Sequence, residues 1–209
     1  MAVNNEDIHL LNSLEARFSQ YFGLSTDDWQ RFSRQGQLAR YEKGQSVFHA
    51  GEIDDRVRIV CEGLLCNFYL TPQGTRRNKS FLQTGDISAC LSSFAADLPA
   101  RFSCEALGNT VCFEISAKAM QQLANESAGW RNAYVKMITA LALKKEKREA
   151  DLLLLSPTEL YLEFGQTHPQ LLNHLPNYHI ASYLGITEVS LSRIRAKLGM
   201  QNRYQRQSS

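Results

Sequence analysis

Apolar and polar positions follow two different periods along this chain. Near the N-terminus, residues 8–22 place apolar side chains three or four positions apart, which predicts an amphipathic helix. From Arg40 onward, short apolar runs are separated by turns that contain glycine, and this pattern predicts strands. The expected strands are Ser46–His49, Val57–Cys61, Leu65–Leu70, Lys79–Leu82, Phe102–Ala106 and Val111–Ile115. Many short strands joined by glycine turns favour a β sandwich or barrel.

Helical periodicity returns after the last strand. Ser116 is expected to cap a short helix, and a longer helix should run from about Glu126 to Leu155. An apolar stripe on the longer helix consists of Trp130, Tyr134, Met137, Ile138 and Leu141. The stripe can pack on the chain's own β domain or form a helix–helix dimer seam, and both can hold on different faces.

The stretch Asn177–Gly199 has the pattern of two short helices joined by a tight turn at Gly185. A small residue, Ala181, stands where the helices would cross, and Thr187 is a good N-cap for the second helix. One buried face is expected to hold Ile180, Leu184, Leu191, Ile194 and Leu198. This pattern is typical of a DNA-binding helix-turn-helix, and an ordinary helical hairpin is the alternative. Ser156, Pro157 and Glu159 predict a capped helix start that opens this domain.

Polar side chains on the second helix are the candidate DNA contacts. Arg193 is expected to read a guanine, because its guanidinium can bond to two atoms of that base. Glu188 could accept a hydrogen bond from a cytosine amino group, and Arg195 and Lys197 are expected to contact phosphates. The full candidate set is Thr187, Glu188, Ser190, Ser192, Arg193, Arg195 and Lys197.

Composition and charge fit this interpretation. The chain has 209 residues, 44% hydrophobic and 21% charged, as in a soluble globular protein. No apolar run approaches the length of a membrane span and the N-terminus lacks a signal-peptide pattern, so a cytoplasmic protein is expected. The net charge is +2, but residues 176–209 carry five basic residues against one acidic and the remainder sums to −2. Positive charge is therefore concentrated where phosphates would be met.

The five cysteines show no metal-site spacing. No C-x-x-C pair occurs, so we expect small buried thiols in a reducing compartment and neither a metal nor a cofactor. A cupin-type metal enzyme is the alternative from another class, but His49 is the only histidine of the β region. No nucleophile elbow or phosphate loop occurs either, so the chain is not expected to be an enzyme.

The glycine pattern and the C-terminal motif together resemble one family. Tyr41-x-Lys-Gly44, His49-Ala-Gly51-Glu52, Ile59-Val-x-Glu-Gly63, Pro72-Gln-Gly74 and Gly85-Asp86 are similar to the cyclic-nucleotide-binding roll of the CRP/FNR transcription regulators. Ile180–Thr187 and Ser190–Ile194 resemble the family's winged helix-turn-helix.

The resemblance implies an α+β fold: an N-terminal antiparallel β roll (a double-stranded β-helix) with flanking helices, a long dimerisation helix, and a winged helix-turn-helix. The expected domains are 1–125, 126–155 and 156–209, with the wing largely before Asn177. Implied partners are double-stranded DNA and a second copy of the chain, and the resemblance also admits RNA polymerase and an unidentified small-molecule effector.

The family's cassette for a cyclic nucleotide is altered in this chain. Cyclic-nucleotide binders of the family use a Gly-Glu pair and then an Arg followed by Ser or Thr. Here Ala89 and Cys90 stand at the Gly-Glu positions, and Arg101 is followed by Phe102. A ribose hydroxyl would lose a charge-assisted hydrogen bond of about 1.5–3 kcal/mol. We therefore expect that cyclic AMP does not control the protein, and that another ligand of the roll would lie near Cys90, Arg101 and Phe102.

Overall fold

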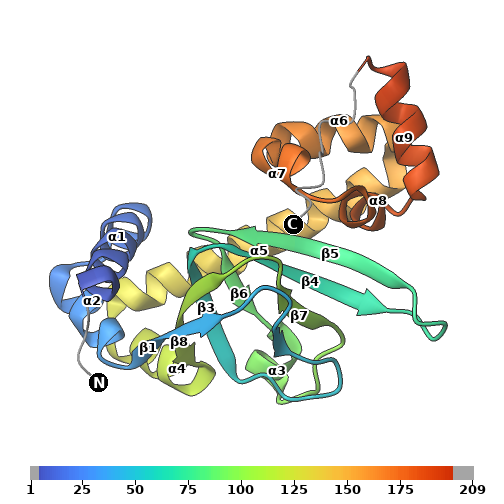
Figure 1. Ribbon diagram of the computed structural model, residues 1–209. Coiled ribbons are helices and arrows are strands. Elements are labelled where there is room, and N and C mark those ends of the chain that lie inside the picture. Colours follow the sequence, from blue (N-terminus) through green and yellow to red (C-terminus); the bar gives the residue numbers. More distant parts are fainter. Residues whose placement is uncertain (1–4, 200–209) are drawn as a thin grey trace. The chain divides into compact units, whose positions relative to one another are not determined.

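The computed structural model describes residues 5–199 of the chain (Figure 1). Arg203 and Arg206, which contribute to the basic C-terminal charge, lie outside the described residues. The helices are α1 Asn5–Phe22, α2 Thr26–Ser33, α3 Leu91–Ala96, α4 Ala117–Glu126, α5 Ala128–Leu154, α6 Pro157–Thr167, α7 Pro169–His174, α8 Asn177–Leu184 and α9 Glu188–Lys197. The strands are β1 Gly36–Tyr41, β2 Ser46–Phe48, β3 Arg56–Glu62, β4 Leu64–Leu70, β5 Arg76–Gln83, β6 Ile87–Ala89, β7 Ser103–Ala106 and β8 Thr110–Ser116.

Contacts within the chain divide it into two compact units. The roll unit comprises the chain up to Tyr69 together with Lys79–Leu141, and the helical unit comprises Leu70–Asn78 and the chain from Ala142. The division falls inside α5, so this helix contributes to both units. The domain boundaries expected at 125/126 and 155/156 stay predictions.

Two four-stranded sheets form the roll unit (Figure 1). Their strand orders are β1-β8-β3-β6 and β2-β7-β4-β5. Distant segments become neighbours, because β1 pairs antiparallel with β8 from Gly36 opposite Ile115 to Tyr41 opposite Thr110. The expected antiparallel roll is confirmed, and the patterns missed only the strands β1 and β6, of which β6 has three residues.

Aromatic rings join the flanking helices to the first sheet. The Phe32 ring of α2 is fully buried, with its centroid 4.8 Å from that of Phe113 and 4.7 Å from that of Trp130. Tyr134 and Met137 pack against the same core. This half of the α5 stripe therefore packs on the chain's own β roll, whereas Ile138 and Leu141 are not members of that core.

The cysteines of the roll unit are structural thiols. All five are free, and only Cys61 is partly exposed. Burial raises the pKa of Cys112 to about 12 and that of Cys61 to about 11, so both stay protonated at neutral pH. The burial of four of the five thiols agrees with the interpretation from their spacing, whereas the reducing compartment stays a prediction.

A buried ion cluster ties three strands of the first sheet together. Arg58 of β3, only 4% exposed, donates from Nη1 to Asp54 at 2.9 Å and from Nε to Glu114 of β8 at 2.8 Å. The hydroxyl of Tyr41 in β1 also donates to Glu114. Burial lowers the pKa of Arg58, but the two carboxylates outweigh it and the net pKa is raised. The guanidinium is thus held charged inside the roll.

The helical unit contains the second half of α5, the four helices that follow, and the Leu70–Asn78 segment. Ser156 caps α6 in a capping box with Glu159: the Ser156 N–H donates to the carboxylate at 2.8 Å, and the Glu159 N–H donates to the Ser156 hydroxyl at 3.4 Å. Lys147 of α5 donates at 2.7 Å to Asp151 of the same helix and also at 2.7 Å to Glu163 of α6.

The wing that was expected before Asn177 is absent from the described residues of this unit. Helices α6 and α7 fill the chain from Pro157 to His174, and a two-residue link, Leu175-Pro176, leads directly into α8. This part of the prediction is wrong, because helix-capping residues and prolines at both helix starts specify helices and not a hairpin.

Candidate functional site

The predicted helix-turn-helix is formed by α8 and α9. Gly185 closes α8 with φ 75°, a left-handed conformation that suits glycine, and the next amide, Ile186 N–H, donates to Ala181 O at 3.0 Å. Thr187 caps α9, since its hydroxyl accepts from the Ser190 N–H at 3.1 Å. Buried side chains from both helices form the joint core, namely Ile180, Ala181, Leu184 and Leu191. The turn follows the sequence expectation, as do Ile180, Leu184 and Leu191, whereas Ile194 and Leu198 of the expected buried face are only partly buried.

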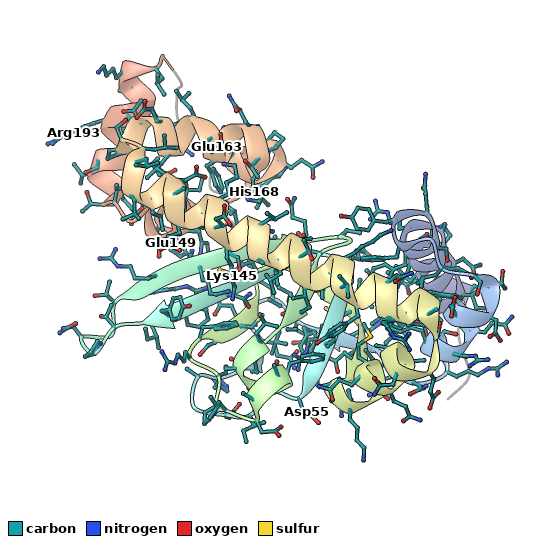
Figure 2. All side chains as sticks on the ribbon, turned by 180° about the vertical axis from the view of Figure 1, so that it is seen from behind. Asp55, Lys145, Glu149, Glu163, His168 and Arg193 are labelled. Carbon is teal, nitrogen blue, oxygen red and sulfur yellow. The ribbon has the colours of Figure 1, made fainter. Side chains whose placement is uncertain are left out.

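One continuous stripe of α9 faces outward. Its members recur at helical spacing and are all exposed: Glu188, Val189, Ser192, Arg193, Ala196 and Lys197. Arg193 points away from the body of the helical unit (Figure 2). Four of these six residues, Glu188, Ser192, Arg193 and Lys197, belong to the predicted set of DNA contacts. The stripe therefore presents a carboxylate, a hydroxyl and two cations on one side of a helix.

Thr187 and Ser190, two further predicted DNA contacts, take part in the cap at the start of α9. Their hydroxyl oxygens lie 2.9 Å apart and share a hydrogen bond. Thr187 is exposed and Ser190 partly exposed. Both hydroxyls are thus oriented by the cap before any ligand arrives.

Arg195 does not belong to the outward stripe. Only 6% of it is exposed, and its guanidinium donates to Tyr161 Oη at 3.1 Å, Asn177 Oδ1 at 2.6 Å and Leu172 O at 3.4 Å. These contacts tie α9 to α6, α7 and α8. The expectation of a phosphate contact is corrected, because the side chain is buried among its own helices. Its spacing of four residues from Leu191 was the signal that could have placed it there.

The first residues of β5 pack on α8 within the helical unit. Asn78 Nδ2 lies 3.0 Å from the carbonyl oxygen of His179 and 3.1 Å from its Nδ1. The Asn78 N–H donates to Ser182 Oγ at 2.9 Å, and this hydroxyl donates to Arg76 O at 2.9 Å. Burial, together with the charge of Arg76, lowers the pKa of His179 to about 4. No local pattern predicts this contact, because it joins residues about a hundred positions apart.

The ligand region predicted in the roll unit is filled by aromatic side chains. Phe102 is buried, and its ring centroid lies 5.4 Å from that of Phe48 and 6.0 Å from that of Tyr69. Lys79 Nζ lies over the same ring at 4.4 Å from its centroid. Arg101, the neighbouring residue, is exposed. The Phe102 ring is therefore surrounded by two other rings and an ammonium group.

Cys90, the third residue of that predicted region, is 1% exposed and precedes α3. Burial raises the pKa of its thiol, but hydrogen bonds from the side chains and backbone of Ser92 and Ser93 outweigh this, and the net pKa lies below the ordinary value. Burial raises the pKa of Tyr69. The charge of Cys90 raises this pKa further, and the charge of Arg101 lowers it. The structure thus brings Cys90, Arg101 and Phe102 to one end of the roll.

The exposed apolar surface of α5 begins where the core contacts end. Val135 is 58% exposed and, with Tyr134, Ile138 and Thr139, lines one side of an apolar groove of about 370 Å³. Leu91 and Ala95 of α3 line the other side. Of the five residues predicted for a dimer seam, Trp130 is fully buried in its own roll and so is excluded from such a seam, whereas Ile138 lies in the groove.

In residues 5–199 no group of three or more His, Cys, Asp or Glu side chains is arranged to hold a metal ion. In the same range, no helix combines the length and apolar character that a membrane crossing requires.

The chain is similar to known proteins both in sequence and in structure. Residues 38–127 match the family model of the cyclic nucleotide-binding domain. FixK2 from Bradyrhizobium japonicum superposes with a TM-score of 0.67 at 18% identity, covering 83% of this chain and 89% of that chain. The c-di-GMP responsive global regulator CLP from Xanthomonas campestris superposes with a TM-score of 0.64 at 16% identity, covering 84% and 92%. A CooA mutant from Carboxydothermus hydrogenoformans superposes with a TM-score of 0.65 at 15% identity, covering 80% of this chain and 78% of that chain.

At these identities the similarity shows the fold, and it confirms the resemblance that the glycine pattern and the helix-turn-helix predicted. A search of curated protein sequences returns no match.

Proposed function

Because the chain carries a cyclic nucleotide-binding domain and has the fold of CRP/FNR transcription regulators, we propose that it is a sequence-specific DNA-binding regulator. It acts as a homodimer on a near-palindromic operator and is not controlled by cyclic AMP. RNA polymerase is an expected partner of such a regulator, and the cytoplasm is its expected location.

The outward stripe of α9 is the observation that carries this proposal. A helix that enters the major groove must present donors and acceptors to base edges along one face. Arg193 offers a bidentate donor for guanine, and Glu188 offers an acceptor for a cytosine amino group. Lys197, near the C-terminal end of the stripe, is suited to a phosphate. Arg195 is left out of this set, since its donors are used inside the helical unit.

The dimer would form along the exposed face of α5. Val135, Ile138, Ala142, Lys145 and Glu149 follow one another at alternating spacings of three and four, which is the spacing of a coiled-coil seam. Lys145 and Glu149 lie on the part of α5 that belongs to the helical unit (Figure 2). Their opposite charges can pair across two copies of the helix. Two reading helices would then meet half-sites about one DNA turn, roughly 34 Å, apart.

The filled roll supports the absence of control by cyclic AMP. A cyclic nucleotide needs room for a phosphate beside an arginine, and here the rings of Phe102, Phe48 and Tyr69 occupy the region next to Arg101. The segment from Ile87 to Ala96 contains no carboxylate for a ribose hydroxyl. A small anionic effector is the second candidate, favoured by the proximity of Lys79 to the Phe102 ring and of Arg101 to Tyr69.

Selection of bound sequences from random double-stranded DNA, followed by affinity measurement at fixed salt, tests the proposal. The full-length protein should yield a near-palindromic consensus, with two chains on each operator by analytical ultracentrifugation. Arg193→Ala should lose about 1–3 kcal/mol of binding free energy and relax preference at one base pair per half-site.

Arg17→Ala is the matched control, because it removes the same charge at an exposed position of α1. It should bind the operator as the wild type does. Selection without any consensus, or an unchanged preference in Arg193→Ala, would refute the proposal.

A further inference from the structure

Val189 is a branched apolar side chain near the start of a mostly polar reading surface. It is 60% exposed and lies in the first turn of α9. The adjacent members of the outward stripe are Ser192 and Arg193, three and four residues further along. The patterns in the sequence assigned Val189 neither to the core nor to the DNA contacts.

Folding gives no reason for a valine at this position. The buried side of α9 is formed by Leu191 and Arg195, and Val189 lies away from it. A β-branched residue on an exposed helix surface is less favourable than the straight-chain residues that usually occur there. Its methyl groups are therefore available to a partner of the reading surface.

The chemistry of the major groove offers one apolar feature on a base edge. Thymine carries a C5-methyl group there, whereas cytosine, adenine and guanine present only hydrogen-bonding groups or C–H edges. The first turn of a recognition helix is the part that contacts base edges. Residues four apart on a helix have Cβ atoms about 5–6 Å from each other, and successive bases on a strand rise by about 3.4 Å. The base read by Val189 would thus lie within two base pairs of the base read by Arg193.

We propose that Val189 reads the methyl group of a thymine in each half-site and so determines part of the sequence specificity. This inference rests on the proposed DNA-binding function. It adds recognition of a methyl group, which the hydrogen-bonding side chains of α9 cannot read.

Replacement of single thymines by deoxyuridine tests the inference, since this change removes only the C5-methyl group. The operator comes from selection with the wild-type protein, and each thymine is replaced in turn. One replacement per half-site should weaken binding about fourfold, the effect of one methyl group that is no longer buried. In Val189→Ala the same replacement should change affinity by less than about 1.5-fold, whereas the other replacements should act as in the wild type.

Ile53→Ala is the matched control, because Ile53 is an exposed β-branched residue of the roll unit, 58% exposed. It should keep the fourfold effect of deoxyuridine. Thermal unfolding of both variants checks that folding is unchanged.

The outcomes separate the inference from the function on which it rests. If selection gives no consensus, the proposed DNA-binding function fails. If a consensus appears but no thymine is sensitive to deoxyuridine, or the sensitivity persists in Val189→Ala, DNA recognition stands and the role of Val189 is overturned.

Discussion

Among residues 5–199, each of the two units buries one arginine, and the two side chains join different kinds of elements. In the roll unit, Arg58 lies between two carboxylates, Asp54 and Glu114. In the helical unit, the guanidinium of Arg195 donates to the phenol of Tyr161, the side-chain amide of Asn177 and the backbone carbonyl of Leu172. Both side chains are less than 10% exposed.

The difference shows what each buried arginine holds together. Arg58 joins two strands of the roll through an ion cluster with Asp54 and Glu114. Arg195 joins helices of the helical unit, since its three acceptors come from α6, α7 and α8. A buried arginine can therefore cross-link either a sheet or a helical core, and in both places its donors are used inside the fold.

The largest effect is expected when the roll cluster loses its cation. Arg58→Met leaves Asp54 and Glu114 buried without a partner of opposite charge, and the free energy of unfolding should fall by about 3–5 kcal/mol. Urea denaturation followed by tryptophan fluorescence measures this. Arg56→Met is the control, because that side chain is 43% exposed and should change stability by less than about 0.5 kcal/mol. A loss as small as that of the control would contradict the role of the cluster.

The next effect concerns His179, a base that the helical unit buries in its neutral form. His179 has a pKa of about 4 in the fold against an ordinary 6.5, so protonation favours the unfolded state. Its contribution is complete above pH 6.5 and is lost as the pH falls towards 4, by at most about 3 kcal/mol. Unfolding at a series of pH values should show this slope in the wild type and a weaker one in His179→Gln.

His9→Gln, the same substitution at an exposed position of α1, is the control for this measurement and should retain the wild-type slope. Equal slopes in His179→Gln and the wild type would show that His179 does not govern the pH dependence.

The smallest of the three effects separates the two arginines of α9. Arg195→Lys keeps the charge but cannot reach three acceptors at once, and the unfolding free energy should fall by about 2 kcal/mol. Arg193→Lys, two residues away and exposed, should leave stability unchanged and weaken operator binding instead. Paired denaturation and binding curves make the comparison. The assignment of buried and exposed roles would be wrong if the two variants behaved alike.

Much of this molecule follows from local pattern. Glycine turns between apolar runs predicted six of the strands, and Ser156 with Glu159 specified the start of α6. The turn at Gly185, the cap at Thr187 and the spacing from Ile180 to Leu191 fixed the helix-turn-helix. These features depend on residues within a few positions of one another, because backbone conformation, capping and helical periodicity are short-range properties.

Only the tertiary structure decided which side chains are available to a partner. Arg193 and Arg195 are alike in charge and two positions apart, yet packing against α6, α7 and α8 buries one and leaves the other in the outward stripe. The docking of Asn78 on His179 joins segments about a hundred residues apart. The filling of the roll by Phe102 and the burial of Trp130 also depend on distant partners. Burial is a property of the assembled neighbours of a residue, and the chain's own periodicity constrains it only in part.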